Sequence, residues 1–322
     1  MRSFHRWWGR TTIPVVGVDI SSSGVRVMEL APCGRHVQIA HYAHQRLPAG
    51  AIREGNVVMR DAVCDALRDA LRESGSRLRH AALALPASAV IKKTLSLPAQ
   101  STEDELEMHV EAEAMALLPV AREEIGVDFA ILGPSIHEAD ALDVMLVAAR
   151  QEKINERAEL AIAVGLKPQM IDVESQALMS AIGLMLKSSE PPADRLLGVI
   201  QIEADQVHAY FMLGEALLFE RHLGSMLVRK EASAVESICQ EFNRAFQLSQ
   251  TSAGQASLHH IYLLGPAPAG LQSALAQRMS VAVSALDPWQ QLAVKPGVVA
   301  DDQEHPSACT LVCGLALRSF DP

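Results

Sequence analysis

Two parts of this chain, residues 15–48 and 196–224, follow the same pattern of three strand-like segments separated by short turns. Helix-like segments follow each set of strands, and this alternation is typical of α/β proteins. A Rossmann unit begins with one strand that leads directly into a helix, so a pattern that begins with a hairpin argues against that fold. We therefore predict two related α/β halves that arose by internal duplication.

The length and composition are consistent with this prediction. At 322 residues the chain is long enough for two domains of ~150 residues each. Hydrophobic residues make up 49% of the chain and aromatic residues 4%, so we expect a mainly aliphatic core. The net charge of −10, with no long basic segment, argues against nucleic acid as a partner. The five cysteines are scattered, and no second pair completes a metal site, so we expect reduced thiols in a cytoplasmic protein.

Residues 101–118 give the clearest helix pattern. Ser101 and Thr102 are both candidate N-caps, and Asp104 and Glu105 stand three residues after them, as a capping box requires. The many carboxylates of this helix could suggest acid–base chemistry, but a solvated helix face explains them better. The remaining predictions are helices at 57–73, 152–164, 232–250 and 308–320, a strand that leads into a helix at 169–186, and a linker between the halves at 188–195.

The first ten residues, MRSFHRWWGR, combine aromatic and basic side chains. Such a segment can rest on an anionic membrane or on a membrane-protein partner. Three arginines supply only ~3 kcal/mol of attraction, at about 1 kcal/mol each. We therefore keep two interpretations of residues 2–10, a peripheral membrane contact and an ordinary chain terminus. Neither a signal peptide nor a membrane span is predicted.

The first hairpin, VVGVDISSSGVRVMEL at residues 15–30, places three serines and a glycine shortly after Asp19. Small residues let backbone N–H groups approach a phosphate, serine hydroxyls add donors, and a carboxylate can organise Mg²⁺. An ordinary β-hairpin turn accounts for the same residues without any ligand. From these residues alone, a phosphate loop and a plain turn are both open.

The same hairpin closely resembles the start of the PilM family, which are cytoplasmic actin-like proteins of type IV pilus assembly and relatives of the cell-division protein FtsA. Further segments within residues 13–320 fit this family in the same order: VDFAILG, DVMLVAAR, AVGLKPQMIDVESQAL, QEFNRAFQL, IYLLGP and CGLALR. The resemblance implies an actin-like fold, which is a duplicated ribonuclease H-like α/β fold, with an inserted α/β subdomain. The implied divisions are a basic aromatic tail at 1–12, a first subdomain at 13–90, the inserted subdomain at 91–165, a connection at 166–190 and a second subdomain at 191–322.

The resemblance also implies a site for ATP and Mg²⁺. Asp19 and Asp172 would face the metal, and Arg26 stands where related folds often have a lysine. The implied nucleotide-binding residues are Asp19, Ser21, Ser22, Ser23, Gly24, Arg26, Asp172 and Gly265.

The second half departs from the family pattern. Gln201 occupies the position where an aspartate is expected, and Glu203 and Asp205 bring carboxylates into the turn that follows. Pro266 fixes φ and removes a backbone donor in the adenosine loop. Only fifteen residues separate the segments RHLG and QEFNRAFQL, so we expect a reduced lobe on the nucleotide side. No constellation of a base and a nucleophile is visible, and an enzyme is therefore not the favoured interpretation.

By this resemblance we expect a scaffold that binds the N-terminal tail of PilN, a bitopic inner-membrane protein, and links it to cytoplasmic motor components of the pilus. The tail would lie beside the strand at 87–98, with Val90, Ile91, Lys92 and Lys93 as candidate contacts. Exposed strand edges suit the recognition of extended peptides. The expected location is the cytoplasm, at the inner membrane. The alternatives are an ATP-binding switch or ATPase, and an equivalent scaffold of an MSHA-type pilus or a type II secretion platform.

Overall fold

The fold is taken from a computed structural model of the chain. It describes residues 13–53, 55–135, 138–186, 195–203, 206–214, 216–224, 231–253, 256–300 and 304–320. The basic aromatic tail predicted at 1–12 lies outside the described residues, as does the linker predicted at 188–195 except for its last residue.

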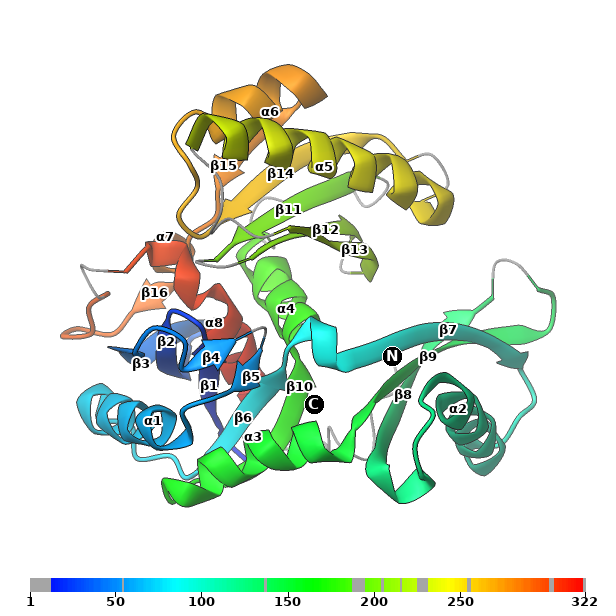
Figure 1. The fold of residues 1–322 in the computed structure, drawn as a ribbon, viewed down its shortest axis with the longest axis horizontal. Helices are drawn as coiled ribbons and strands as arrows, with labels where there is room; N and C mark the ends of the chain where they lie inside the picture. The colour runs from blue at the N-terminus through cyan, green and yellow to red at the C-terminus, as the bar shows by residue number, and fades with distance from the viewer. Residues whose placement is uncertain are drawn as a thin grey trace.

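The first half is built on a six-stranded sheet (Figure 1). Its first three strands form an antiparallel meander, and β6 and β10 continue the sheet in parallel with β1. In spatial order the strands are β10 (Lys167–Val173), β6 (His80–Leu85), β1 (Val16–Ser21), β2 (Gly24–Cys33), β3 (His36–Arg46) and β16 (Ala293–Val294). A separate short ladder joins β4 (Ile52–Arg53) to β5 (Asn56–Val57).

The second half repeats this strand order. Again the first three strands form an antiparallel meander. The fourth strand pairs in parallel with the first strand of the meander, and the fifth pairs in parallel with the fourth. In spatial order they are β13 (Ala216–Gly224), β12 (Val207–Leu213), β11 (Leu196–Ile202), β14 (Leu258–Leu264) and β15 (Ala282–Ala285). The shared order confirms the predicted duplication.

Helices cover both faces of each sheet. The outer face of the first sheet packs on α1 (Arg60–Ser74) and α3 (Gln151–Ala163), and that of the second sheet on α5 (Glu231–Ala253) and α6 (Leu271–Met279). The helix α1 begins three residues later than predicted because Asn56–Val57 pairs with β4 as a strand. A short helix, α7 (Pro288–Gln291), precedes β16.

Two helices lie between the halves (Figure 1). They are α4 (Glu174–Leu186) and α8 (Thr310–Leu317). One core cluster contains Met28 from the first sheet, Leu178 from α4, Val312 from α8 and Met212 from the second sheet. This cluster fixes the first hairpin, α8 and the second sheet relative to one another, which is what positions the site described below.

The inserted part is a three-stranded antiparallel sheet in the order β7 (Val90–Pro98), β9 (Ala141–Arg150) and β8 (Ile125–Pro134), covered by α2 (Glu103–Leu117). The capping box of α2 is present, with Thr102 as the N-cap and Glu105 as its partner. The division of the chain at 91 and 165 stays a prediction, and α3 packs on the first sheet.

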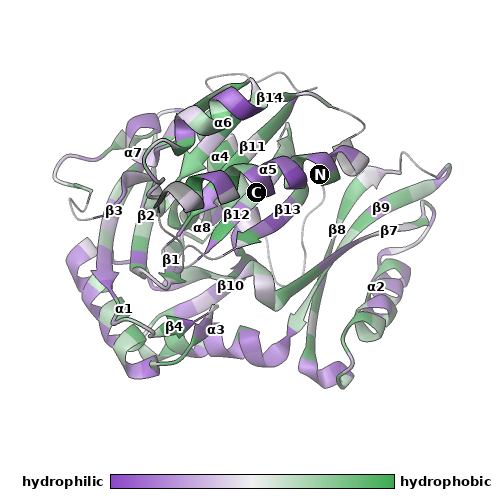
Figure 2. Cartoon of the chain, turned by 45° about the horizontal axis from the view of Figure 1, so that its top comes forward, coloured by the Kyte–Doolittle hydropathy of each residue, from purple (hydrophilic) through white to green (hydrophobic). Residues whose placement is uncertain are grey.

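Figure 2 shows hydrophobic stretches on β8, β9 and β11 and hydrophilic stretches on α1, α3 and α5, as expected for outer helices over a sheet. Among the described residues, no helix has the length and apolar character needed to cross a membrane.

Candidate functional site

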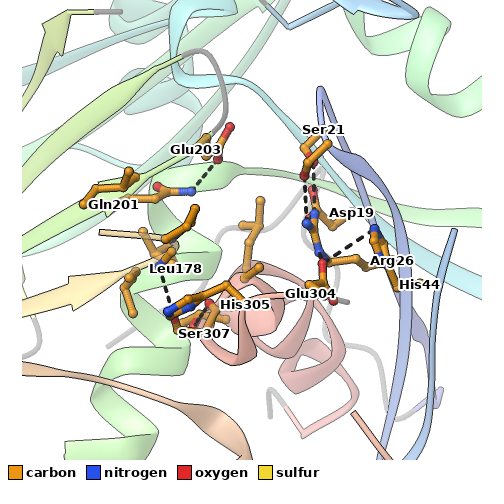
Figure 3. A pocket seen from close by; sticks show the side chains of 18 of the residues that line it. Asp19, Ser21, Arg26, His44, Leu178, Gln201, Glu203, Glu304, His305 and Ser307 are labelled. Carbon is orange, nitrogen blue, oxygen red and sulfur yellow. Dashed lines mark hydrogen bonds and ion pairs between the residues drawn. The ribbon is translucent and has the colours of Figure 1, made fainter. Parts of the chain in front are cut away.

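A cavity of about 300 Å³ lies between the two halves. Residues of the β1–β2 hairpin line one side, the turn after β11 and the loop after β14 line the other, and the segment leading into α8 forms the base (Figure 3). Five of the predicted nucleotide-binding residues line it: Asp19, Ser21, Ser23, Arg26 and Gly265.

The hairpin residues are arranged around the guanidinium of Arg26. Asp19 and Arg26 are cross-strand neighbours, and each is only 4% exposed. Arg26 Nη1 donates to Asp19 Oδ2 at 2.8 Å and to Ser21 Oγ at 2.9 Å, and Nη2 donates to Ser23 Oγ at 2.8 Å. Two hydroxyls of the predicted phosphate cradle, those of Ser21 and Ser23, therefore accept hydrogen bonds from a cation of the protein itself.

The residue that sequence reasoning missed is Glu304. Its carboxylate accepts from Nε of Arg26 and from the hydroxyl of Tyr42, and His44 Nε2 lies 3.6 Å from Oε1. The Glu304 side chain is 7% exposed. Its local sequence, DDQEHP, resembles any polar loop and gave no signal, because its partners lie more than 250 residues away.

Burial and charge together set the ionisation of this cluster. Burial raises the pKa of Asp19, against the attraction of Arg26, and Glu304 raises it further. Burial works against the charged guanidinium, but Asp19 and Glu304 together hold the pKa of Arg26 above its ordinary value. Burial and the Glu304 carboxylate raise the pKa of Tyr42. Arg26 is therefore a fixed cation shared by two buried carboxylates, and Tyr42 is a fixed hydroxyl donor.

Gly24 has a packing role in this hairpin. A Cβ atom at Gly24 would lie 2.4 Å from His44 Nε2 and 2.6 Å from the carbonyl oxygen of Gln45. Of the residues that the structure describes, neither Ser22 nor Gly24 lines the cavity. A glycine here is explained by the close approach of β3 and requires no phosphate.

Asp172, the second predicted metal ligand, is held by another arginine. Its Oδ2 accepts from Arg318 Nε at 2.7 Å and Nη2 at 2.6 Å, and its Oδ1 accepts from the backbone N–H of Val173 at 2.6 Å. Asp172 is fully buried and does not line the cavity. The structure thus places both predicted metal ligands in ion pairs with guanidiniums.

The polar side chains of Gln201 and Glu203, at the end of β11, form hydrogen bonds within the protein. Gln201 Nε2 donates to Glu203 Oε1 at 2.7 Å, Tyr210 donates to Gln201 Oε1 at 2.9 Å, and Gln206 Nε2 donates to Glu203 Oε2 at 3.2 Å. Asp205 lies outside the described residues. The side chains that replace the expected aspartate therefore hold one another in place.

The backbone of Gly265 is also occupied by contacts within the protein. Its N–H donates to Ser307 Oγ at 2.7 Å, and a Cβ atom there would lie 1.9 Å from the carbonyl oxygen of Ile202. Its φ of +87° is a further reason for glycine. The loop that would face adenosine is packed against β11 and the segment before α8.

The four residues predicted to contact a partner lie at the start of β7. Lys92 Nζ is 2.5 Å from Glu220 Oε1 on β13 and donates to Ser175 Oγ at 2.8 Å. Lys93 Nζ is 2.5 Å from Glu113 Oε1 on α2, and its side chain is 46% exposed. The other two, Val90 and Ile91, are partly buried. Lys92 thus joins the inserted sheet to the second half, while Lys93 remains at the surface.

Comparison with known proteins identifies the family. A family model described as "Type IV pilus assembly protein PilM" matches residues 17–227 and 233–320. The chain belongs to the PilM family. The resemblance inferred from the sequence is therefore confirmed over nearly the whole chain.

One solved structure matches the fold over the whole of its chain. The chain is similar to a chain of a "PilM-PilN type IV pilus biogenesis complex", at 24% identity, with 97% of this chain and 100% of that chain covered and a TM-score of 0.80. A protein from Bacteroides thetaiotaomicron, described as having an actin-like ATPase fold and unknown function, matches at 11% identity over 87% and 93% of the two chains, with a TM-score of 0.47. The match to the chain of the PilM-PilN complex confirms the predicted actin-like α/β fold.

An actin-like fold implies Mg²⁺ and ATP, but the cavity residues do not fit them. Of the described residues that line the cavity, Asp19, Glu203 and Glu304 carry carboxylates, and Arg26 and Arg46 carry guanidiniums. At ~4 Å and an effective dielectric of ~20, each further negative charge beside one carboxylate costs about 4 kcal/mol. All three nitrogens of Arg26 already donate within the protein. Among the described residues, no group of three or more His, Cys, Asp or Glu side chains is arranged so that it could hold a metal ion.

Proposed function

We propose that this PilM family member is a non-catalytic scaffold of type IV pilus assembly that binds the N-terminal cytoplasmic tail of a PilN-like membrane protein. The observation that carries the proposal is the position of β7. In the described part of the chain, this strand pairs with β9 on one side only. The free edge begins where the inserted sheet meets the rest of the molecule, because Lys92 contacts Glu220 and Ser175, and it runs outward from there (Figure 1).

An extended tail can add to this edge as a further strand. Main-chain hydrogen bonds would supply affinity, and side chains alternating along the tail would supply specificity. Along the outer part of β7, the exposed Thr94 and Ser96 alternate with the partly buried Leu95 and Leu97, and Lys93 is also exposed. Lys93 could contact an acidic group of the tail, because its salt bridge with Glu113 is exposed and contributes only ~0–1 kcal/mol.

Binding such a tail would place the protein at the cytoplasmic face of the inner membrane, where it could couple the membrane complex to motor components of the pilus. Residues 2–10, with their basic and aromatic side chains, are candidates for an additional membrane contact. Liposome co-sedimentation of the full chain and of a chain lacking residues 2–10 tests this contact. An equivalent role in an MSHA-type pilus or a type II secretion platform is the related alternative, and the neighbouring genes would distinguish the two.

The direct test is fluorescence anisotropy with a labelled peptide that spans the N-terminal cytoplasmic tail of the PilN protein of the same organism. We expect saturable binding in the micromolar range, no binding of a scrambled peptide, and weaker binding when alternate peptide nitrogens are methylated. Lys93→Glu should weaken binding, whereas Lys167→Glu on β10 should not. Absence of binding at several hundred micromolar peptide, with the protein folded by circular dichroism, would reject the proposal.

An ATP-dependent switch is the second candidate, and it is favoured only by the fold. It predicts micromolar Mg-ATP binding that is lost in Asp19→Ala. From the arrangement around Arg26 we expect no heat of binding and no thermal shift on titration with Mg-ATP.

A further inference from the structure

The groups around the Glu304 carboxylate form a preorganised binding site for an oxyanion. A guanidinium nitrogen of Arg26 and the Tyr42 hydroxyl donate to its two oxygens, and His44 Nε2 lies 3.6 Å from one of them. Guanidinium, phenol and imidazole are donors that recognise carboxylate or phosphate oxygens. The side chains of Arg26, His44 and Glu304 are each less than a tenth exposed, so their charges are largely shielded from water.

This carboxylate stands at the hairpin that the family resemblance associates with phosphate. Arg26 contacts the hairpin hydroxyls through its two terminal nitrogens and Glu304 through Nε. Glu304 lies 278 residues from Arg26 in the sequence and directly precedes the helical segment that leads into α8. Figure 3 shows Glu304 beside Arg26 and His44, on the hairpin side of the cavity.

We propose that Glu304 is a built-in anion: its carboxylate occupies the oxyanion site of Arg26, Tyr42 and His44 that would otherwise bind a phosphate group. The chain thus supplies from its own C-terminal segment the negative charge that a nucleotide would bring. As a consequence, the Arg26–Glu304 ion pair joins the β1–β2 hairpin to the segment before α8 permanently, with no need for a ligand.

Two further observations support this inference. Thr310 and Leu311, at the start of α8, line the same cavity as Glu304, so the ion pair holds the helix start against the hairpin. A Cβ atom on Gly17, in the first strand, would lie 2.5 Å from the carbonyl oxygen of Val312. The first strand and α8 are thus packed in direct contact, which agrees with an ion pair that holds the start of α8 near the hairpin.

The test compares two substitutions that differ in the space they leave. Glu304→Ala empties the site and should allow inorganic phosphate to bind in the millimolar range, measured by isothermal titration calorimetry. Glu304→Gln fills the same space without the charge and should bind no phosphate. Wild-type protein should bind neither phosphate nor Mg-ATP. Both variants should melt roughly 5 °C or more below wild type, because a buried guanidinium loses a partner.

Phosphate should restore part of the lost melting temperature of Glu304→Ala, relative to chloride at equal ionic strength, and Arg26→Gln in the same background should abolish that response. Phosphate binding by wild type as strong as by Glu304→Ala would overturn the proposal, and so would a folded Glu304→Ala that binds none. If Glu304→Ala fails to fold, its refolding yield in phosphate against chloride is the readout, and equal yields reject the idea. Peptide binding to β7 is measured in a separate experiment. A negative result with phosphate therefore rejects the role of Glu304 without rejecting the scaffold function, and the reverse also holds.

Discussion

Asp172 and Arg318, which are 146 residues apart, form a buried ion pair in which one carboxylate oxygen accepts from two guanidinium nitrogens, at 2.7 and 2.6 Å. The Asp172 side chain is fully buried and that of Arg318 is 11% exposed. The pair ties the end of β10, at the centre of the chain, to the turn that follows α8. This ion pair explains why an aspartate is buried at position 172 without invoking a metal ion.

Removal of Arg318 should therefore destabilise the protein strongly. Arg318→Ala leaves the Asp172 carboxylate buried without this cation, and we expect the free energy of unfolding in urea to fall by about 3–5 kcal/mol. Asp172→Asn combined with Arg318→Ala should cost less than the sum of the single changes, because the charge is removed together with its partner.

The matched control is Arg278→Ala, which breaks an exposed pair with Glu236 whose side chains are 38% and 61% exposed. We expect a loss below ~1 kcal/mol there. Equal losses for the buried and exposed arginines would contradict the role given to the Asp172–Arg318 pair.

Much of the fold could be predicted because its signals are local. The capping box of α2 needs only Thr102 and Glu105, three residues apart, and both meander patterns lie within short segments of the chain. Asp19 and Arg26 also face each other across one hairpin, so the pattern of small residues in its turn indicated the two strands that carry them.

The rest of the site depends on pairs that are distant in the sequence. Glu304 contacts Arg26 and Tyr42, and Arg318 contacts Asp172, over separations of 146 to 278 residues. No periodicity or spacing marks such a pair, since each partner sits in an ordinary strand or loop. A resemblance to a family identifies the residues that the chain shares with that family. It does not identify a residue such as Glu304, which we propose takes the place of a phosphate group in this chain.

Two glycines in the paired helices α4 and α8 should respond in opposite ways to alanine. A Cβ atom at Gly314 would lie 1.8 Å from the carbonyl oxygen of Ala177, whereas a Cβ atom at Gly183 meets nothing within 4 Å. We expect Gly314→Ala to lower the free energy of unfolding by about 1–3 kcal/mol through overpacking. Gly183→Ala should raise it by up to ~1 kcal/mol through helix propensity. Urea denaturation of both variants checks this, and stabilisation by Gly314→Ala would show that α4 and α8 do not approach so closely.

The Lys92–Glu220 pair should hold the inserted sheet to the second half. The two side chains are 16% and 26% exposed, and Lys92 also donates to Ser175 on α4. We expect Lys92→Met to cost about 1–2 kcal/mol, mostly from the polar groups left partly buried. It should also speed backbone hydrogen exchange in β13. Lys93→Met, next to it on the exposed side of β7, should change neither quantity measurably, and equal effects of the two changes would argue against a bridging role.

The cluster around Glu174, the first residue of α4, should make stability depend on pH. Burial and the nearby carboxylates Glu203 and Asp19 raise the pKa of Glu174 to about 8, against the attraction of Arg157. The carboxyl group therefore holds its proton more tightly in the folded protein than in the unfolded chain. A group of this kind stabilises the fold at low pH, and its contribution is lost as the pH rises toward 8.

Each unit of pKa difference corresponds to about 1.4 kcal/mol, so Glu174 should lower the free energy of unfolding by roughly 2–4 kcal/mol between pH 5 and pH 9. Glu174→Gln keeps the shape and the acceptor for the backbone N–H of Ala87 but removes the titration. We expect this variant to be more stable than wild type at pH 9 and to show little advantage at pH 5. Urea denaturation of both proteins across this range measures the difference directly. Parallel stability curves for the two proteins would mean that Glu174 titrates alike in the folded and unfolded states.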